Sequence, residues 1–316
     1  MELKAEFLSI VLWIVGIVVG LTAVALIAFN FYMGSSKPII EGELTVSVLD
    51  ENVTVIRDEM GVPHIEAQSD ADLYRAQGYV QAQDRLFQMD LARRQASGRL
   101  AEVIGEAAVE NDKFFRTFSL RDAAEKSWDG YDAQSKQVLE WFTEGVNAYI
   151  EEGRLSYEFN LLGYEPELWT PIDSLTIGKF MAYDLGGNWN LLAFRHWALN
   201  NLSEQQVAEM IVDYPEEARS IIEANLENEV QVADAFHIDA IPNEFNGSNN
   251  WVVAADKSET GAPLLADDPH LGLDTPSIWY QMHLKSPEQN VSGVIFTGIP
   301  GIILGHNEQV AWGVTN

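Results

Sequence analysis

Residues 7–33 form an uncharged run in which Ile, Val, Leu and Ala predominate. A transmembrane helix needs about 20 mostly apolar residues, so this run is long enough to cross a bilayer. A cleaved signal peptide has a shorter apolar core, of about 7–15 residues, followed by a site of small residues. The Gly-Ser-Ser at residues 34–36 would serve as such a site, although the length of the run favours an uncleaved anchor. In both cases we expect the rest of the chain to be exported.

The charge and the cysteine content argue against several classes of protein. The 19 Lys and Arg residues are outnumbered by 48 Asp and Glu residues, which gives a formal net charge of −29. Affinity for nucleic acids comes mostly from Lys and Arg, so the composition predicts no nucleic-acid partner. The absence of cysteine excludes disulfides, thiolate metal sites and a cysteine nucleophile. The acidity fits a high-salt environment, where like charges are screened, but many secreted proteins are acidic too.

The composition divides the chain into four segments. Residues 1–36 contain the apolar run, residues 37–223 have a mainly helical pattern, residues 224–247 form an acidic spacer, and residues 248–316 are rich in short strands. Helices followed by strands are typical of an α+β fold. Apolar periodicity predicts a strand pair within 44–57, helices over about 71–97, 132–152, 174–183 and 203–213, and strands over 250–255, 263–266, 277–284, 291–296 and 310–314.

The common catalytic signatures are absent from the sequence. It contains no G-x-S-x-G elbow, no H-E-x-x-H zinc helix and no G-x-x-x-x-G-K-[ST] phosphate loop. Gly298, Gly301 and Gly305 do not have the spacing of a dinucleotide-binding loop. The pair Gly247-Ser248 remains, between the acidic spacer and a predicted strand. Taken alone, such a pair is usually only a turn.

The surroundings of this pair resemble a known family. Residues 248–253 (Ser-Asn-Asn-Trp-Val-Val), followed by Asp268-Pro269-His270, are similar to the start of the nucleophile chain of the penicillin acylases, or penicillin amidases. These are N-terminal-nucleophile hydrolases. The resemblance covers about residues 44–316, and several independent motifs occur in the family's order. The other matching segments are 82–90, 93–102, 162–166, 169–171, 279–284, 298–301, 305–307 and 311–316.

The resemblance implies an architecture and a processing step. We expect an αββα sandwich, incomplete in this chain and preceded by a single transmembrane helix. Family precursors are more than twice as long, so the chain is expected to be an N-terminal fragment of one. The precursor is expected to cut itself between Gly247 and Ser248, and its two chains to remain together as a heterodimer. Glycine before the cut tolerates the unusual backbone that strain-driven cleavage needs.

The family's chemistry gives roles to three residues. Ser248 would be the nucleophile, and its freed α-amine, with an ordinary pKa of about 7.7–8.0, would be the base for its own hydroxyl. No separate His or Asp is then required, which explains the missing triad. His270 occupies the family's position for orienting the serine hydroxyl and amine. The backbone N–H of Asn316 matches one oxyanion donor, and a second donor would lie beyond residue 316.

The motif matches for substrate-binding and metal-binding residues are weaker than those for the catalytic residues. Met181 and Leu185 match the region that lines the acyl pocket in the family, although apolar residues at helical spacing are more often plain core. The family usually has a calcium-binding Glu shortly after a Gly-Asn-Trp motif. Here residues 187–189 (Gly-Asn-Trp) are followed by Asn-Leu-Leu-Ala, without a carboxylate. Calcium binding is therefore left open, and no other cofactor is expected.

The expected function is that of an amidohydrolase cleaving N-acyl compounds, penicillins or related acyl amides, through an acyl-enzyme. The alternatives are an acyl-homoserine-lactone acylase of the same family and a non-catalytic exported binding protein that keeps the fold. The expected partners are a small N-acyl substrate and a membrane, crossed by residues 7–33. We expect a single-pass protein with its catalytic part outside the cytoplasm, or a secreted protein if the segment is cleaved.

Overall fold

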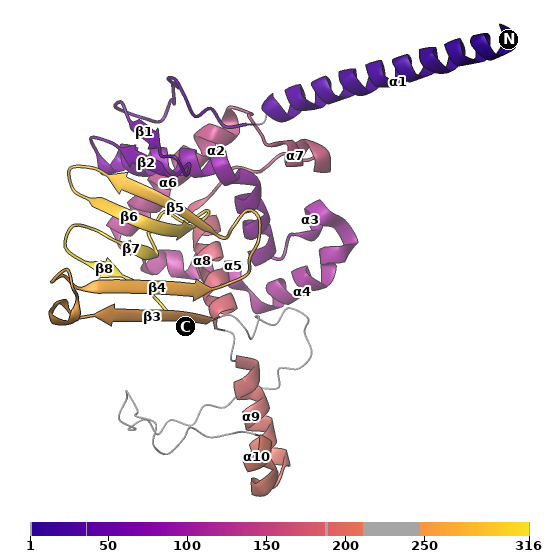
Figure 1. Ribbon diagram of the computed structural model, residues 1–316. Coiled ribbons are helices and arrows are strands. Elements are labelled where there is room, and N and C mark those ends of the chain that lie inside the picture. Colours follow the sequence, from indigo (N-terminus) through magenta and orange to yellow (C-terminus); the bar gives the residue numbers. More distant parts are fainter. Residues whose placement is uncertain (1, 36, 187–188, 211–246, 316) are drawn as a thin grey trace.

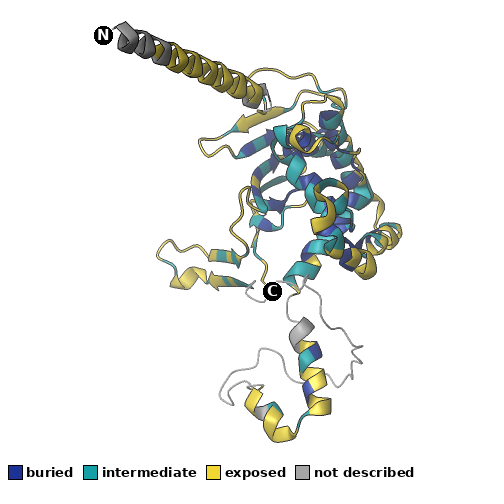
Figure 2. Ribbon diagram, turned by 90° about the vertical axis from the view of Figure 1, so that its right-hand side faces the viewer, coloured by how far each residue is buried: buried dark blue, intermediate teal, exposed yellow. Residues whose placement is uncertain are grey.

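The computed structural model describes residues 2–35, 37–186, 189–210 and 247–315 and has an α+β architecture (Figure 1). Helix α1 (Glu2–Ser35) projects from the body as a single rod, and its residues 12–32 are exposed (Figure 2). Within it, Leu12–Tyr32 has a mean hydropathy of 2.6. The helix is thus long and apolar enough to cross a membrane, a test that a signal sequence near the N-terminus also passes.

A six-stranded sheet joins strands from both sides of the acidic spacer. Its order is β1-β2-β5-β6-β7-β8, and only the β2–β5 pair is parallel among the described strands. His64 on β2 lies opposite His283 on β5. The segment before residue 224 therefore contributes two strands to a sheet built mostly after residue 279. The strands are β1 (Thr54–Arg57), β2 (Pro63–Glu66), β5 (Trp279–Lys285), β6 (Asn290–Phe296), β7 (Leu304–His306) and β8 (Ala311–Trp312).

Helix α2 (Asp70–Ala96) is the centre of the core. Its first half packs on one face of the sheet, where Leu73 and Val80 share a buried cluster with Met282. Farther along, Met89 joins a second cluster with α6 (Ala133–Glu151). The helix begins one residue earlier than the pattern predicts, because Ser69 is its N-cap: the Ser69 hydroxyl accepts a 3.2 Å hydrogen bond from the Asp72 N–H.

Helices α2 and α6 touch backbone to backbone at two glycines. A methyl group on Gly145 would lie 1.8 Å from the Arg75 carbonyl oxygen, and one on Gly78 would lie 2.1 Å from the Phe142 carbonyl oxygen. Real side-chain carbons do not approach this closely, so the helices can cross here only because both positions lack a side chain.

We expect Gly145→Ala to destabilise the protein by about 3 kcal/mol, because the new methyl group must push two packed helices apart. Gly178→Ala is the matched control: a methyl group there would be 3.9 Å from Ile299 Cδ1, an ordinary contact. Alanine in that helix interior should stabilise the protein by up to about 1 kcal/mol. Urea unfolding of the two variants should therefore give changes of opposite sign; equal changes would contradict the close approach.

Most of the remaining helices surround this core, whereas the two within residues 189–210 extend away from it (Figure 1). No helix was predicted from the sequence within 101–130, where Gly105 (φ 77°) and Ser119 (φ 59°) separate consecutive short helices. The other helices are α3 (Ala101–Ile104), α4 (Val109–Phe118), α5 (Leu120–Gly130), α7 (Tyr157–Leu162), α8 (Pro171–Leu185), α9 (Trp189–Asn201) and α10 (Glu204–Met210), with 3-10 turns at Gly105–Ala108 and Ala255–Lys257.

Two strand predictions around residue 50 also differ from the structure. No strand forms over 44–49, which was expected to be the first of the pair. The second strand of the observed hairpin is instead β2, which starts at Pro63, beyond the predicted range of 44–57. Proline lacks an N–H, but it is tolerated as the first residue of a strand.

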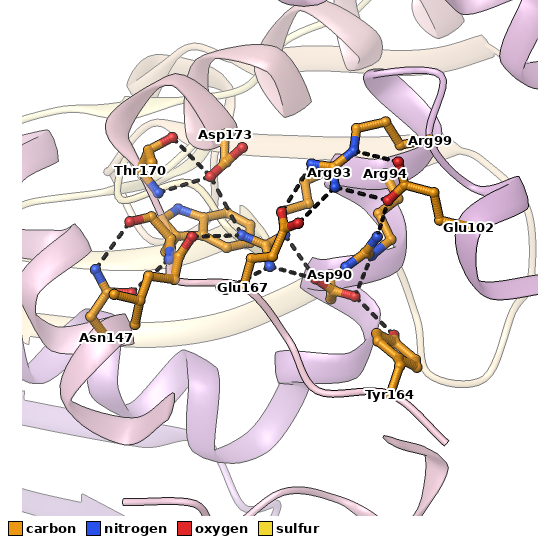
Figure 3. Close-up of polar contacts among 12 residues, drawn as sticks. Asp90, Arg93, Arg94, Arg99, Glu102, Asn147, Tyr164, Glu167, Thr170 and Asp173 are labelled. Carbon is orange, nitrogen blue, oxygen red and sulfur yellow. Dashed lines mark hydrogen bonds and ion pairs between the residues drawn. The ribbon is translucent and has the colours of Figure 1, made fainter. Parts of the chain in front are cut away.

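A buried ion network ties α2 to the segment leading into α8 (Figure 3). Asp90 is fully buried; its Oδ1 accepts from Arg93, its Oδ2 accepts from Arg94 at 2.8 Å, and the Tyr164 hydroxyl donates to Oδ2, also at 2.8 Å. The Arg93 guanidinium in turn donates to the Glu167 carbonyl at 2.7 Å. Burial, reinforced by the Asp90 charge, raises the pKa of Tyr164, so the hydroxyl stays a donor.

A second set of buried contacts fixes the turn after β6. The Gln77 side-chain amide donates to the Pro300 carbonyl at 2.8 Å, and Gln81 both donates to the Ile299 carbonyl and accepts from the Gly298 N–H. Gly298 has φ of 91°, a conformation that glycine adopts readily. Helix α2 thus positions the sheet and the turn that leads to residues 302–315.

Candidate active site

The predicted nucleophile begins a separate two-stranded ribbon. Strands β3 (Gly247–Val253) and β4 (Leu264–His270) pair antiparallel and lie below the six-stranded sheet in Figure 1. Gly247 lies opposite His270, and Ser248 lies opposite Pro269. Both strands extend beyond the predicted ranges, and Ser248 is the second residue of β3 rather than part of a turn.

The Ser248 hydroxyl is held by Thr315, the last described residue. Ser248 Oγ donates to Thr315 Oγ1 at 2.8 Å, and Thr315 Oγ1 donates to the Ser248 carbonyl at 3.0 Å. Pro269, opposite Ser248, has no N–H to offer the strand ladder. Thr315 was not predicted as a site residue, although it lies in the 311–316 motif, which is the signal that would have found it.

His270 lies at the end of β4 and faces away from this contact. Alternation along the strands puts His270 and Ser248 on opposite faces of the ribbon. His270 Nε2 is 3.1 Å from Asp268 Oδ2 and 3.5 Å from the Asn249 side-chain nitrogen. Among the described residues, no hydrogen bond joins His270 to Ser248. Its role in orienting the serine stays a prediction.

Asn316 and the Gly187-Asn188 pair lie outside the described residues, so the structure does not test the oxyanion donor or this part of the Gly-Asn-Trp motif. Within the described ranges, no group of three or more His, Asp or Glu side chains could hold a metal ion. Calcium binding by the longer protein is left open by this result.

Met181 lines a cavity of about 500 Å³ between α2, α8 and the loop before β5. Met181 is 4% exposed, and Ile177 and Phe180 line the same cavity from α8, opposite Phe296. The lining is mainly apolar on this side, as a pocket for an acyl chain would be. Leu185, one turn farther along α8, is half-buried and does not line the cavity. Assignment of either residue to substrate binding stays a prediction.

Comparison with known proteins identifies the family. The family model described as penicillin amidase matches residues 52–316, which include the ribbon, the sheet and α2. The chain belongs to the penicillin amidase family. This confirms the resemblance of the sequence motifs.

Several members of the penicillin amidase family are similar to this chain over most of its length. Penicillin acylase 2 proenzyme from Pseudomonas sp. is 35% identical over 297 residues, with 89% of this chain and 38% of the relative covered. Acyl-homoserine lactone acylase QuiP from Pseudomonas aeruginosa is 33% identical, with 89% of this chain and 35% of the relative covered. Penicillin G acylase from Escherichia coli is 26% identical, with 83% of this chain and 38% of the relative covered. The chain thus spans less than two fifths of the length of these relatives.

A solved structure also matches. Thermostable penicillin G acylase from Alcaligenes faecalis is 29% identical to this chain, with 55% of this chain and 98% of the solved chain covered and a TM-score of 0.46.

Proposed function

We propose that the full-length protein is an amidohydrolase that cleaves N-acyl compounds through Ser248. The observation that carries this proposal is the position of Ser248 directly after Gly247 at the start of a strand, with its hydroxyl fixed by Thr315. Membership of the penicillin amidase family supports the same reaction. The proposed architecture is the αββα sandwich of N-terminal-nucleophile hydrolases, to which the six-stranded sheet and the ribbon would both belong.

The proposed processing step makes the nucleophile. The Ser248 oxygen attacks the Gly247 carbonyl carbon, the Gly247–Ser248 peptide C–N bond breaks, and the Ser248 nitrogen takes up the proton. Water then hydrolyses the resulting ester, which leaves a carboxylate on Gly247 and a free α-amine on Ser248. The parallel β2–β5 ladder supports a lasting heterodimer, because each product chain supplies one of its two strands.

The proposed catalytic cycle uses this amine as the base. It takes the proton from the Ser248 hydroxyl, the oxygen attacks the amide carbonyl, and backbone N–H donors such as that of Asn316 stabilise the oxyanion. The amine of the substrate leaves with a proton, and water releases the acid from the acyl-enzyme. Met181 and the apolar wall of the cavity that it lines are proposed to receive the acyl chain. Residues 7–33 are proposed to anchor the exported enzyme to the membrane.

Both penicillins and acyl-homoserine lactones are candidate substrates. Similarity supports both classes, because a penicillin acylase is 35% identical to this chain and an acyl-homoserine lactone acylase QuiP is 33% identical. Acyl preference depends on the shape of the pocket, and discrimination by one methylene contributes only about 1–3 kcal/mol. A panel that varies the acyl length and the amine separately would assign the substrate.

The test of the proposed function uses the full-length protein and a sulfonyl fluoride. We expect hydrolysis of at least one N-acyl amide in the panel, and loss of that activity in step with sulfonylation of Ser248, in which an O–S bond forms and fluoride leaves. Peptide mass mapping should place the added group on the new N-terminal residue. A correctly folded protein that hydrolyses no panel member and takes up no reagent would support the non-catalytic binding protein instead.

A further inference from the structure

We propose that Asp267 is a positioning residue whose carboxylate pairs with the α-ammonium group that self-cleavage creates on Ser248. The proposal deepens the proposed function, because it needs the new N-terminus. It rests on the place of Asp267 in the ribbon, and on two findings among the described residues: its carboxyl group has no hydrogen-bond partner, and the ribbon carries no other charge on that face.

Asp267 lies on the same face of the ribbon as Ser248. It is directly opposite Asn250, two residues after Ser248 on β3, and alternation brings the three side chains to one face. Diagonal neighbours of this kind have Cα atoms about 7–8 Å apart, close enough for a carboxylate to reach a group at the end of the partner strand. His270, the residue assigned to orientation by family resemblance, is on the other face.

The segment that holds Ser248 also covers Asp267. A methyl group on Gly313 would lie 2.5 Å from Asp267 Oδ1 and 2.7 Å from the Asn250 side-chain nitrogen. Glycine at 313 therefore allows the backbone to pass directly over the carboxyl group. Two residues later, Thr315 makes its contacts with Ser248. One short segment thus encloses both the nucleophile and the carboxyl group.

The carboxyl group of Asp267 is enclosed without a partner. Both oxygens are shielded from solvent and accept no hydrogen bond from the described residues. Burial, together with the nearby charge of Asp268, raises the pKa of Asp267. An isolated buried carboxylate is costly, and an unpaired group of this kind in a native structure calls for an explanation.

No described charge on this face can neutralise Asp267. Strand β3 and residues 311–315 contain no Asp, Glu, Lys, Arg or His. On β4 the other titratable groups are Asp268 and His270, which contact each other on the opposite face. Cleavage of the Gly247–Ser248 bond would place a new cation at the end of β3. The ammonium is formed again whenever the amine takes the serine proton, and a carboxylate close to it would stabilise that state, as the aspartate of a Ser-His-Asp triad stabilises the imidazolium.

The first arm of the test measures stability in the uncleaved and the cleaved protein. In a full-length Ser248→Ala precursor, Asp267→Asn should raise the melting temperature at pH 7, because a neutral amide replaces an unpaired carboxylate. The gain should vanish below the ordinary aspartate pKa of about 3.9, where the carboxyl group is protonated in both the folded and the unfolded state. In the cleaved protein with Ser248 intact, the same substitution should give no gain or a loss, because it removes an ion pair.

The second arm measures the pKa of the new amine through the pH dependence of Ser248 sulfonylation. The pH of half-maximal rate should fall by about one unit or more in Asp267→Asn, because an opposite charge no longer favours the ammonium form. Asp268→Asn is the matched control, since this neighbouring side chain is 75% exposed and lies on the other face. It should shift the half-maximal pH much less.

The outcomes separate this proposal from the proposed function. Equal changes in melting temperature in both protein forms, or one half-maximal pH shared by wild type and Asp267→Asn, would overturn the ion pair while leaving the hydrolase intact. A wild-type protein of uncut intact mass would overturn the processing step and, with it, the ion pair. A stability gain confined to the precursor, joined to a lowered half-maximal pH, is the result expected.

Discussion

Ser248→Ala is expected to leave the full-length protein as one uncut chain without amidohydrolase activity. The wild type should instead give two chains, one of which starts at Ser248. The physical reason is that a methyl group can neither attack the Gly247 carbonyl nor form an acyl-enzyme, so a single substitution removes both reactions. Loss of a serine nucleophile lowers kcat by about 10⁶-fold in well-studied hydrolases. Intact mass, N-terminal sequencing and the N-acyl panel measure the three parts of this result.

Two further variants make the experiment specific. Ser258→Ala changes a serine just beyond β3 whose hydroxyl contacts only Thr260 among the described residues, and it should be cleaved like the wild type. Ser248→Cys keeps a nucleophile at the same position and should restore part of the cleavage. Cleavage of Ser248→Ala at the same bond would show that another group, or a protease, makes the cut.

Apolar patterning of the sequence predicted the long helices, and family-specific motifs predicted the family. Helix α2 is buried around much of its circumference and α6 along one side, and both helices appear close to their predicted bounds. The motif containing Ser248, together with the other segments in the family's order, predicted the family, which the family model confirms. No helix was predicted between Gly105 and Gly130, where the two longest helices have 10 and 11 residues.

Contacts between distant segments could not be predicted from the pattern. Thr315 meets Ser248 across 67 positions of sequence, and Asp267 is isolated only because the backbone at Gly313 folds over it. Neither of these contacts produces a periodic pattern in the sequence. The same holds for the parallel pairing of β2 with β5, in which His64 and His283 lie 219 positions apart in the sequence.

The family motifs upstream of the spacer have a structural explanation. The 82–90 and 93–102 segments supply Asp90, Arg93 and Arg94, and the 162–166 segment supplies Tyr164, so three motifs meet in one buried network. These residues fix α2 against the segment before α8. Because α2 also holds the turn at Gly298, the network supports the elements that lead toward Thr315 without touching Ser248 among the described contacts.

The largest loss of stability is therefore expected from Asp90→Asn. The substitution keeps the shape of the side chain but removes the one negative charge lying between the guanidinium groups of Arg93 and Arg94, which are themselves about 95% buried. Breaking a buried ion pair by removing one partner costs about 3–5 kcal/mol, because the remaining charge stays buried without compensation. Here two buried cations would each lose a partner while keeping one other, Asp173 for Arg93 and Glu102 for Arg94, so urea unfolding of the full-length protein should show a loss within that range.

Glu102→Gln is the matched control, because Glu102 also bridges two arginines, Arg94 and Arg99, but is 43% exposed. Solvent screens an exposed carboxylate, so this variant should lose about 1 kcal/mol or less. Similar losses in Glu102→Gln and Asp90→Asn would mean that bridging, rather than burial, determines the energy of the network. A large loss confined to Asp90→Asn, with self-cleavage slowed in proportion to the fraction unfolded, would show that the upstream motifs act on Ser248 only through the stability of α2.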